Sequence, residues 1–440
     1  MAGSPAGQRL WRELPWWDPW ELTRVLARHC GSKGLVLLDG DGSEHGCHTV
    51  LGVQPLEIIE CRGLPGTAGA ADPFAALAAM KARGGSWLGW LAYEAGAWVE
   101  PADHWQPADM ATLWAARHDP LLHFNLADHR LWLEGVDPAR IEAMEALLAT
   151  IPPVETAEPR CEGIPENSWH WHTDETNFAR QVALLRERIA AGDLFQANLT
   201  ACCETELGSQ PDPLALHGRL RRHCPAPFSA LAVAGEEAVI SASPERFLRL
   251  EPDGRIQTRP IKGTRPRHAD PDADAASAAE LVCSPKDRAE NVMIVDLLRN
   301  DLGRVCRNGS IQVLQLVGLE SYAQVHHLTS VVEGQLAPGV GLVDLLRASW
   351  PGGSITGAPK LRACQRLNHL EPVPRGPYCG SLFQLTADGG FDASILIRSL
   401  MLKGKRLRVH AGGGIVADSD PQLEAEEMGW KLRPLLKALA

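Results

Sequence analysis

The sequence predicts a large α+β fold, and three observations carry this prediction. Strand-like segments with alternating apolar positions and helix-like segments succeed one another along the whole chain. The 440 residues exceed what one ordinary core supports, so we expect two lobes or one unusually large layered domain. With 45% hydrophobic and 22% charged residues, the composition is typical of a folded protein and not of a disordered one.

The first part of the chain, residues 1–155, is expected to form an amino-terminal lobe. Its boundary lies in the Pro-rich stretch 151–170, which lacks periodic apolar positions, and twelve of the 14 tryptophans lie before residue 172. Strand and helix signals alternate in this part, which suggests a mixed sheet with helices on it. We expect strands within 34–40, 86–96 and 129–135 and helices within 72–84 and 139–151.

The second part, residues 170–440, is expected to form the other lobe and opens with a helix over 177–193. The spacing of Ala179, Val182, Leu185 and Ile189 gives this helix one apolar face, and Gly192 is a suitable stop signal. We then expect strands at 228–235 and 237–244, a helical tract at 272–302, two strands within 393–414 around a Lys-Gly-Lys turn, and a final helix at 421–436.

Charge and cysteine usage exclude several classes of protein. The formal net charge of −11 argues against a nucleic-acid-binding surface, which would be basic. The 11 cysteines are an odd number and none forms a C-x-x-C pair, so a reduced, cytoplasmic thiol set is expected. No run of 18 apolar residues and no signal-like start occurs, so we expect neither export nor a membrane span.

Two predicted helices each carry a pair of acids on one face. Asp287 and Glu290 are three residues apart, as are Glu424 and Glu427, and Lys431 lies one turn beyond Glu427. Two carboxylate pairs suit a hard cation such as Mg²⁺, which takes few protein oxygens and leaves room for water and substrate. Taken alone, each pair is weak evidence for a metal site, because two acids on a helix more often form a solvated face or simple ion pairs.

Other segments offer groups for an anion. The glycines 412–414 and the glycine-rich stretch 352–360 with Ser354 follow strand-like runs, where backbone N–H groups can approach a ligand. Tight turns are the simpler interpretation of both. Arg398 alternates with apolar neighbours on a strand that is expected to be buried, and a buried guanidinium needs an anionic partner.

Several longer motifs along the chain, which include the segments described above, form one recognisable series. The segments 192–200, 241–248, 258–267, 286–305, 325–330, 352–360, 375–381, 392–399 and 412–427 resemble, in this order, the chorismate-utilising enzyme family. That family includes component I of anthranilate synthase and of aminodeoxychorismate synthase, isochorismate synthases and salicylate synthases. The resemblance spans about 175–436 and implies a layered α/β/β/α sandwich with two mostly antiparallel sheets and outer helices, in which 170–440 is the catalytic lobe.

The resemblance also implies roles for individual residues. Glu290 and Glu427 match the ligands of Mg²⁺, which carries the ring carboxylate of chorismate, while Asp287 and Glu424 match acids that hold metal-bound water. Positions implied to line the chorismate pocket are Thr264, Ser354, Tyr378, Arg398, Gly412, Gly413, Gly414 and Lys431, with His327 assigned either to substrate binding or to proton handling.

Lys262 distinguishes between members of the family. "PIKGT" resembles the aminodeoxychorismate synthases, which act in folate biosynthesis, whereas members that do not aminate C4 have a small residue here. A lysine can add at C2 of chorismate and expel the 4-hydroxyl, after which ammonia enters at C4. This requires a neutral amine, hence a lowered pKa, to which Arg259 and Arg265 are candidates to contribute. Glu245 matches the general acid that protonates the departing hydroxyl.

Gln196 stands where family members that add water carry a lysine base, so water addition is disfavoured. No glutaminase signature is visible, so we expect the chain to accept free ammonia or to draw it from a separate glutamine amidotransferase subunit. "LLDG" at 37–40 has Gly40 where the feedback site of anthranilate synthases has serine. Tryptophan feedback is therefore not expected, while a bound structural tryptophan stays open. Rival interpretations are anthranilate synthase component I, a non-catalytic chorismate-binding regulatory subunit, and a generic Mg²⁺-binding protein.

Overall fold

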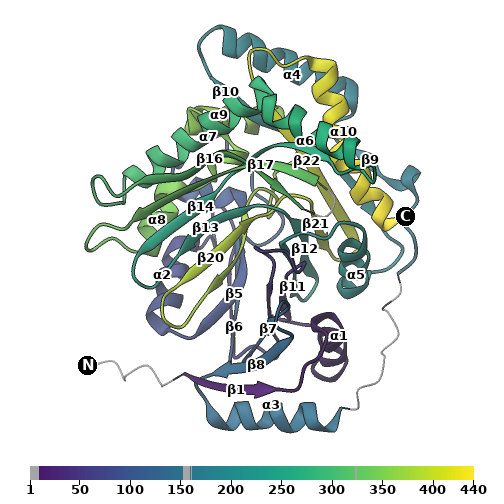
Figure 1. The fold of residues 1–440 in the computed structure, drawn as a ribbon, viewed down its shortest axis with the longest axis vertical. Helices are drawn as coiled ribbons and strands as arrows, with labels where there is room; N and C mark the ends of the chain where they lie inside the picture. Colours follow the sequence, from purple (N-terminus) through teal and green to yellow (C-terminus); the bar gives the residue numbers. More distant parts are fainter. Residues whose placement is uncertain (1–8, 152–158, 160, 323–324) are drawn as a thin grey trace.

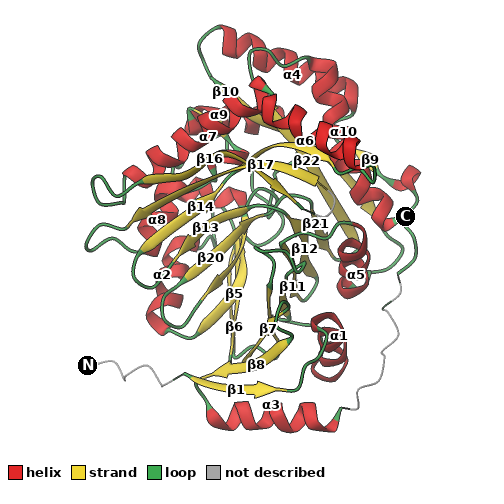
Figure 2. Cartoon of the chain, in the orientation of Figure 1, coloured by secondary structure: helices red, strands yellow, loops and turns green. Residues whose placement is uncertain are grey.

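A computed structural model describes residues 9–151, 159, 161–322 and 325–440. Two large sheets lie against each other and helices cover their outer faces (Figures 1 and 2). The predicted α/β/β/α sandwich is therefore confirmed. The proposed boundary stretch 151–170 falls partly outside the described residues, namely at 152–158 and 160. Of the helices within the described ranges, none is both long enough and apolar enough to span a membrane.

The first sheet has twelve strands, and every strand pair in its described part is antiparallel. Its order is β1-β8-β7-β3-β2-β11-β12-β21-β22-β10-β18, and β9 pairs beside β10. The bounds are β1 Leu10–Leu14, β2 Val36–Asp39, β3 His48–Gly52, β7 Leu121–Asn125, β8 Arg130–Gly135, β9 His170–Trp171, β10 Gln196–Glu206, β11 Phe228–Ala234, β12 Glu237–Ser243, β18 Gly357–Ala358, β21 Ser399–Lys403 and β22 Arg406–Ile415.

The second sheet has ten strands in the order β15-β17-β14-β13-β20-β19-β5-β6-β4, and β16 pairs beside β17. Its described strand pairs are antiparallel as well. The bounds are β4 Glu57–Cys61, β5 Ser86–Leu91, β6 Leu113–His118, β13 Arg246–Leu250, β14 Arg255–Arg259, β15 Ile261–Pro266, β16 Gln312–Ser321, β17 Val325–Gln335, β19 Ser381–Leu385 and β20 Phe391–Ile395.

Helices form the two outer layers. Helices α1, α3, α4, α5, α9 and α10 contact the twelve-stranded sheet, whereas α2, α6 and α7 contact the ten-stranded sheet and α8 packs on α2 and α7. The bounds are α1 Pro19–Cys30, α2 Pro73–Arg83, α3 Pro138–Thr150, α4 Glu175–Ala190, α5 Pro213–His223, α6 Pro271–Cys283, α7 Pro285–Gly303, α8 Leu342–Ser349, α9 Lys360–Leu370 and α10 Pro421–Leu439, with 3₁₀ turns η1 Tyr93–Trp98, η2 Glu166–Ser168 and η3 Gly353–Ile355.

Strand β11 shows how the twelve-stranded sheet is buried on both faces. Its small residues Ala230 and Ala232 lie in the core between the sheets, whereas Leu231 and Val233 lie in the core beneath the outer helices. Side chains of a strand alternate between its two faces, so small residues allow close packing of sheet on sheet while larger ones fill the space under the helices.

The two expected lobes share both sheets. Strand β2 of the first part pairs with β11 of the second, and β5 pairs with β19. The two larger hydrophobic cores also take residues from both parts of the chain. The division at 1–155 and 170–440 therefore does not separate two cores, and the mixed sheet expected for the first part is wrong because its strands are antiparallel and divided between two sheets.

Two further expectations are corrected by local chemistry. The helical tract 272–302 is two helices, because Ser284 caps α7 by accepting from Asp287 N at 3.3 Å and Pro285 cannot continue α6. Arg398 does not lie on a strand. It has φ +50° and lies between β20 and β21, so the run of apolar residues around it turns from one sheet to the other.

Candidate active site

The amine of Lys262 lies inside the protein between strand β15 and helix α7. Its Nζ is 2.8 Å from Glu290 Oε1 on α7 and donates to Ser354 O at 3.1 Å. Gly263 makes this close approach possible, since its φ is +81° and a Cβ there would lie 2.9 Å from the Cβ of Asp287. The sequence 262–263 thus lets β15 press against α7 and brings the amine to the helix-borne acid.

The pKa of Lys262 shifts in the direction opposite to the expected one. Burial disfavours the ammonium, but the carboxylates of Glu290, Glu245 and Glu427 together outweigh it and raise the pKa of Lys262. Arg265 does not counteract them, because it pairs with the carboxylates of Glu280 and Asp287. Arg259 likewise pairs with Glu320. The nucleophile is therefore held as an ammonium by the acids around it.

Glu245 is the second titratable group of this cluster. It precedes β13 and is 5% exposed. Burial raises the pKa of Glu245 to about 7, although a hydrogen bond from Ser354 and the positive charge of Lys262 both favour its ionised form. A carboxyl group with a pKa near neutrality can hold a proton and release it during a reaction, which is the property that a general acid needs.

Each of the four acids predicted to serve a metal is paired with a basic side chain. Among the described residues, no group of three or more His, Cys, Asp or Glu side chains is arranged as a metal cluster. Ionic contacts of 2.8 to 3.2 Å hold the four carboxylates, and Gln196 Nε2 also donates to Glu290 at 2.8 Å. The pairs are Glu290 with Lys262, Asp287 with Arg265, Glu424 with Lys286 and Glu427 with Lys431.

Three of these carboxylates nevertheless converge on two adjacent glycines of β22. A Cβ on Gly414 would lie 2.2 Å from Glu290 Oε1, and one on Gly413 would lie 3.4 Å from Glu424 Oε2 and 3.9 Å from Glu427 Oε1. Carboxylate oxygens are the hard donors that Mg²⁺ prefers, so the donor set fits this ion in its chemistry. A cation bound there would have to exchange with the lysine contacts.

The three glycines were expected in a turn that follows a strand, but they lie within a strand. Gly412, Gly413 and Gly414 belong to β22 and pair with Thr200, Leu199 and Asn198 of β10. Glycine is required by close approach, because a Cβ on Gly412 would lie 2.0 Å from Leu199 O. On the other side of β22, strand β21 pairs only as far as Val409 and does not pair with the glycine run. Lys431 Nζ donates to Gly412 O on that side at 2.9 Å.

His327 is a neutral imidazole beside this cluster. Burial, with a smaller contribution from the charge of Arg398, lowers the pKa of His327 to about 3. Its Nδ1 forms a 2.9 Å hydrogen bond with Thr264 Oγ1 across the β15–β17 pair. Its Nε2 is buried and has no hydrogen-bond partner among the described residues. This geometry favours hydrogen bonding to a ligand over donation of a proton from an imidazolium.

Arg398 and Tyr378 lie on neighbouring turns. Cys379 N donates to Leu396 O and Leu396 N donates to Gly380 O, both at 2.8 Å, which joins the two turns. The Tyr378 ring stacks on His410 at 4.8 Å. Burial lowers the pKa of Arg398, and neither a hydrogen bond nor an ion pair joins its side chain to another described residue. A partly buried, unpaired guanidinium is suited to an anionic ligand.

The sequence did not single out two groups that contact Glu424. Lys286 Nζ lies 2.8 Å from Glu424 Oε1, and Ser419 Oγ donates to the same oxygen at 2.7 Å. Lys286 lies in the first turn of α7, where a lysine is usually a surface residue. The only sequence signal for its role was its position one residue before Asp287.

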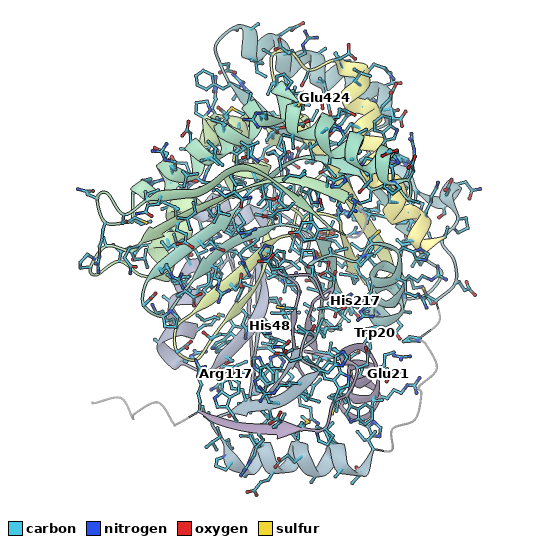
Figure 3. All side chains as sticks on the ribbon, in the orientation of Figure 1. Trp20, Glu21, His48, Arg117, His217 and Glu424 are labelled. Carbon is cyan, nitrogen blue, oxygen red and sulfur yellow. The ribbon has the colours of Figure 1, made fainter. Side chains whose placement is uncertain are left out.

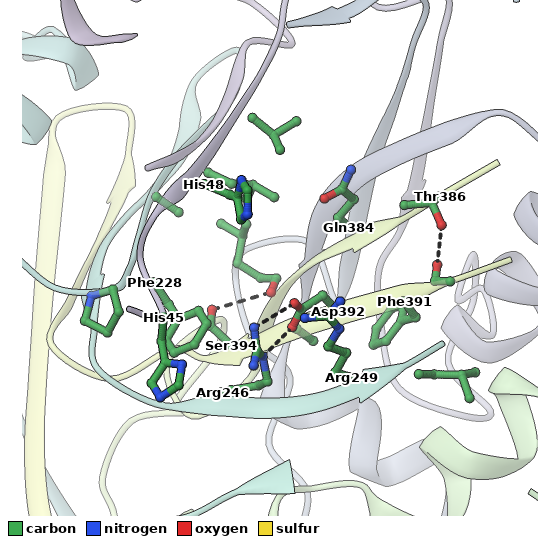
Figure 4. A pocket seen from close by; sticks show the side chains of 18 of the residues that line it. His45, His48, Phe228, Arg246, Arg249, Gln384, Thr386, Phe391, Asp392 and Ser394 are labelled. Carbon is green, nitrogen blue, oxygen red and sulfur yellow. Dashed lines mark hydrogen bonds and ion pairs between the residues drawn. The ribbon is translucent and has the colours of Figure 1, made fainter. Parts of the chain in front are cut away.

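A cavity of about 350 Å³ lies elsewhere, between the two sheets (Figure 4). It is lined by Leu38 and Asp39 of β2 and by Arg246, whose guanidinium bonds both oxygens of Asp392 at 2.9 and 3.1 Å. Its His48 is well separated from Glu424 of the acid cluster (Figure 3). The predicted site residues do not line this cavity. It is therefore distinct from the cluster around Lys262.

Comparison with known proteins shows which family this chain is similar to. The family described as chorismate binding enzymes matches residues 43–437. Aminodeoxychorismate synthase component 1 of Klebsiella aerogenes is 44% identical over 62% of this chain and 60% of its own length. Anthranilate synthase component 1 of Streptomyces coelicolor is 37% identical over 88% of this chain and 81% of its own.

Among solved structures, anthranilate synthase component I from Streptococcus pneumoniae matches with a TM-score of 0.76 and 28% identity, covering 88% of this chain and 92% of that one. The chain spans about half to 60% of the length of the aminodeoxychorismate synthases that it matches first. A family match over residues 43–437, on a shared fold, leads to one conclusion: the chain belongs to the chorismate binding enzyme family.

Proposed function

We propose that this chain is the chorismate-aminating component of an aminodeoxychorismate synthase, a transferase that converts chorismate and ammonia to 4-amino-4-deoxychorismate on the route to p-aminobenzoate and folate. The observation that carries this proposal is the amine of Lys262, 2.8 Å from Glu290 and 3.1 Å from Ser354 O. The 44% identical relative bears the name of that enzyme. A glutamine amidotransferase partner would supply the ammonia.

The residues around Lys262 fit a two-step exchange. Lys262, an ammonium at rest, first loses a proton to solvent. The neutral amine then forms a bond from its nitrogen to C2 of chorismate while the ring double bond shifts and the C4–O bond breaks, and it takes a proton from solvent again after its release. Glu245 gives its proton to the departing hydroxyl, which leaves as water. Ammonia then forms a bond to C4, the bond between C2 and Lys262 breaks, and the amine leaves with its electron pair. The carboxylate of Glu245 regains its proton from the new ammonium group, so atoms and charges balance.

Substrate binding in this proposal relies on two cationic regions. We assign Arg398, with Tyr378 on the neighbouring turn, to the enolpyruvyl carboxylate, because the guanidinium of Arg398 has no partner in the described part of the chain. Glu290 and Glu427 would hold Mg²⁺, with Asp287 and Glu424 behind them. Bound there, Mg²⁺ would offset the repulsion between these acids and the ring carboxylate. His327 Nε2 and the N–H groups of the glycine strand offer neutral hydrogen bonds.

Replacing Glu245 with glutamine is expected to lower kcat about 10²- to 10⁴-fold, as loss of a general acid does. Because the protonated carboxyl is the reactive form and the pKa of Glu245 is raised to about 7, the rate that depends on it falls as pH rises through about 7. This declining limb should disappear in Glu245→Gln. Rates measured from pH 5 to 9 test this, with Glu251→Gln, directly after the end of β13, as control. Identical pH profiles for the wild type and Glu245→Gln would exclude the assigned role.

Product analysis tests the proposed reaction itself. The chain is incubated with chorismate, Mg²⁺ and ammonium, and the product is identified by absorbance and mass. We expect 4-amino-4-deoxychorismate, which retains its enolpyruvyl group. Anthranilate as the main product would favour the second candidate, anthranilate synthase component I, which the 37% identical relative supports by its longer coverage. No turnover even with a glutaminase partner present would favour a regulatory subunit.

A further inference from the structure

Glu371 and Arg375 form a buried ion pair to which the proposed reaction assigns no step. Arg375 Nε donates to Glu371 Oε2 at 2.8 Å and its second terminal nitrogen donates to Glu371 Oε1 at 2.7 Å. The side chain of Arg375 is 1% exposed and that of Glu371 is 4% exposed. A buried pair of this kind is weak evidence for stability, because apolar residues of equal volume often stabilise a fold as well or better. Its presence here therefore calls for another reason.

The remaining hydrogen bonds of the pair lead to segments of the active site. Arg375 donates to Ile355 O at 2.8 Å, directly after Ser354, and to Asn198 O at 2.7 Å. Glu371 Oε1 accepts from Thr200 N at 3.0 Å. Asn198 and Thr200 are the β10 partners of Gly414 and Gly412. The pair thus connects the Ser354 turn to the strand that holds the three glycines in register.

The same arginine begins the turn that carries Tyr378. Gly376 N donates to the buried Glu94 Oε1 at 3.1 Å, and Tyr93 N donates to Gly376 O at 2.9 Å. The guanidinium of Arg375 also stacks over the ring of Tyr93 at 4.6 Å. The start of the turn is therefore fixed from both sides, by 3₁₀ turn η1 of the first part of the chain and by the arginine itself.

We infer that Arg375, held by Glu371, is a positioning residue that keeps the glycine strand, the Ser354 turn and the Tyr378 turn in register for chorismate. The inference rests on the proposed function in so far as chorismate is the substrate. A guanidinium suits this role because its rigid fork donates in several directions at once, to a carboxylate and to two backbone carbonyls. A lysine at the same place would retain the charge but could not make these bonds together.

Replacing Arg375 with lysine is expected to lower kcat/KM for chorismate about 10²-fold per folded molecule, as displacement of a positioned site by about 1 Å does. Most of the loss should appear as a raised KM, because the segments that bind the substrate move while Lys262 and Glu245 are unchanged. Glu371→Gln keeps the shape and one acceptor oxygen, so a loss of about tenfold is expected. Circular dichroism and thermal melting give the folded fraction of each variant.

A matched control separates positioning from stability. Asp39→Asn removes another buried carboxylate, which pairs with the half-buried Arg221 at 2.7 Å and with the buried His217 at 3.3 Å and is not part of the cluster around Lys262. It should lower the melting temperature and leave kcat/KM unchanged. The inference is overturned if Arg375→Lys and Glu371→Gln retain wild-type kcat/KM per folded molecule, or if Asp39→Asn loses as much. Glu371→Gln alone decides if Arg375→Lys does not fold.

The wild-type enzyme is measured first, so that failure of the proposed function is seen separately. If the wild type does not turn over chorismate with ammonium or with a glutaminase, the proposed function fails. Calorimetric binding of chorismate then decides the inference. Weaker binding by both variants and unchanged binding by Asp39→Asn would support it, whereas equal binding by all, or no binding by the wild type, would overturn it.

Discussion

Replacing Lys262 with alanine is expected to lower amination of chorismate at C4 by about 10⁴-fold or more, the range in which loss of a covalent nucleophile falls. The fold and chorismate binding should remain largely intact, because β15 is held by its pairing with β17 and the proposed substrate contacts come from other segments. Single-turnover rates of product formation measure the chemical step, and calorimetry with chorismate measures binding.

Two further variants separate the amine from its charge. Position 262 is 28 residues from Glu290 in the sequence but adjacent to it in the fold. Lys262→Arg keeps a positive charge there, but a guanidinium cannot act as the nucleophile at neutral pH. Its activity should be as low as that of Lys262→Ala. Lys405→Ala, in the exposed turn between β21 and β22, should be as active as the wild type. Activity in Lys262→Arg close to that of the wild type would show that the charge at this position suffices.

Replacing Glu290 or Glu427 with glutamine is expected to lower Mg²⁺-dependent turnover by at least about 10³-fold. A bound cation contributes several kcal/mol to stabilising a transition state, and each ~1.4 kcal/mol corresponds to a factor of ten in rate. Both carboxylates lie at the glycine strand, with Glu290 Oε1 2.2 Å from where a Cβ of Gly414 would be. Turnover during a Mg²⁺ titration, together with Mg²⁺ binding by calorimetry, measures the effect.

Glu426 provides a matched control, since it neighbours Glu427 on α10 but points to another face of the helix. Glu426→Gln should bind Mg²⁺ and turn over chorismate as the wild type does. The metal assignment is wrong if Glu290→Gln and Glu427→Gln bind Mg²⁺ with wild-type affinity, or if the wild type keeps full activity in excess chelator.

The fold was predictable where local pattern decides it and not where distant segments pair. The strand expected at 228–235 and the helix expected from the periodicity at 177–193 are confirmed as β11 and α4. The pairing of β2 with β11 joins residues some 190 positions apart, and no local pattern specifies it. For this reason the sequence suggested two lobes, whereas the strands of both parts share two sheets. Pro285 was the local signal that could have divided the long helical tract.

In the site, the sequence indicated which residues to consider but not how they contact one another. The motifs singled out Lys262 and Glu290 as site residues, but their 2.8 Å contact requires β15 to pack on α7. The direction of the Lys262 pKa was wrong for this reason, since the sequence placed arginines nearby and the fold places carboxylates there. Arg375 lies within a recognised motif, yet its bonds to Ile355 O and Asn198 O join segments that only the tertiary structure brings together.

The most direct test of the central claim, that the amine of Lys262 bonds to chorismate, is the mass of the peptide that carries it. Enzyme is incubated with chorismate and Mg²⁺ without ammonia, quenched, digested and analysed. The peptide containing Lys262 should gain the mass of chorismate less one water, and the gain should disappear when ammonium is added before quenching. An unmodified peptide, in enzyme that aminates the same chorismate once ammonium is supplied, would contradict the covalent role of Lys262.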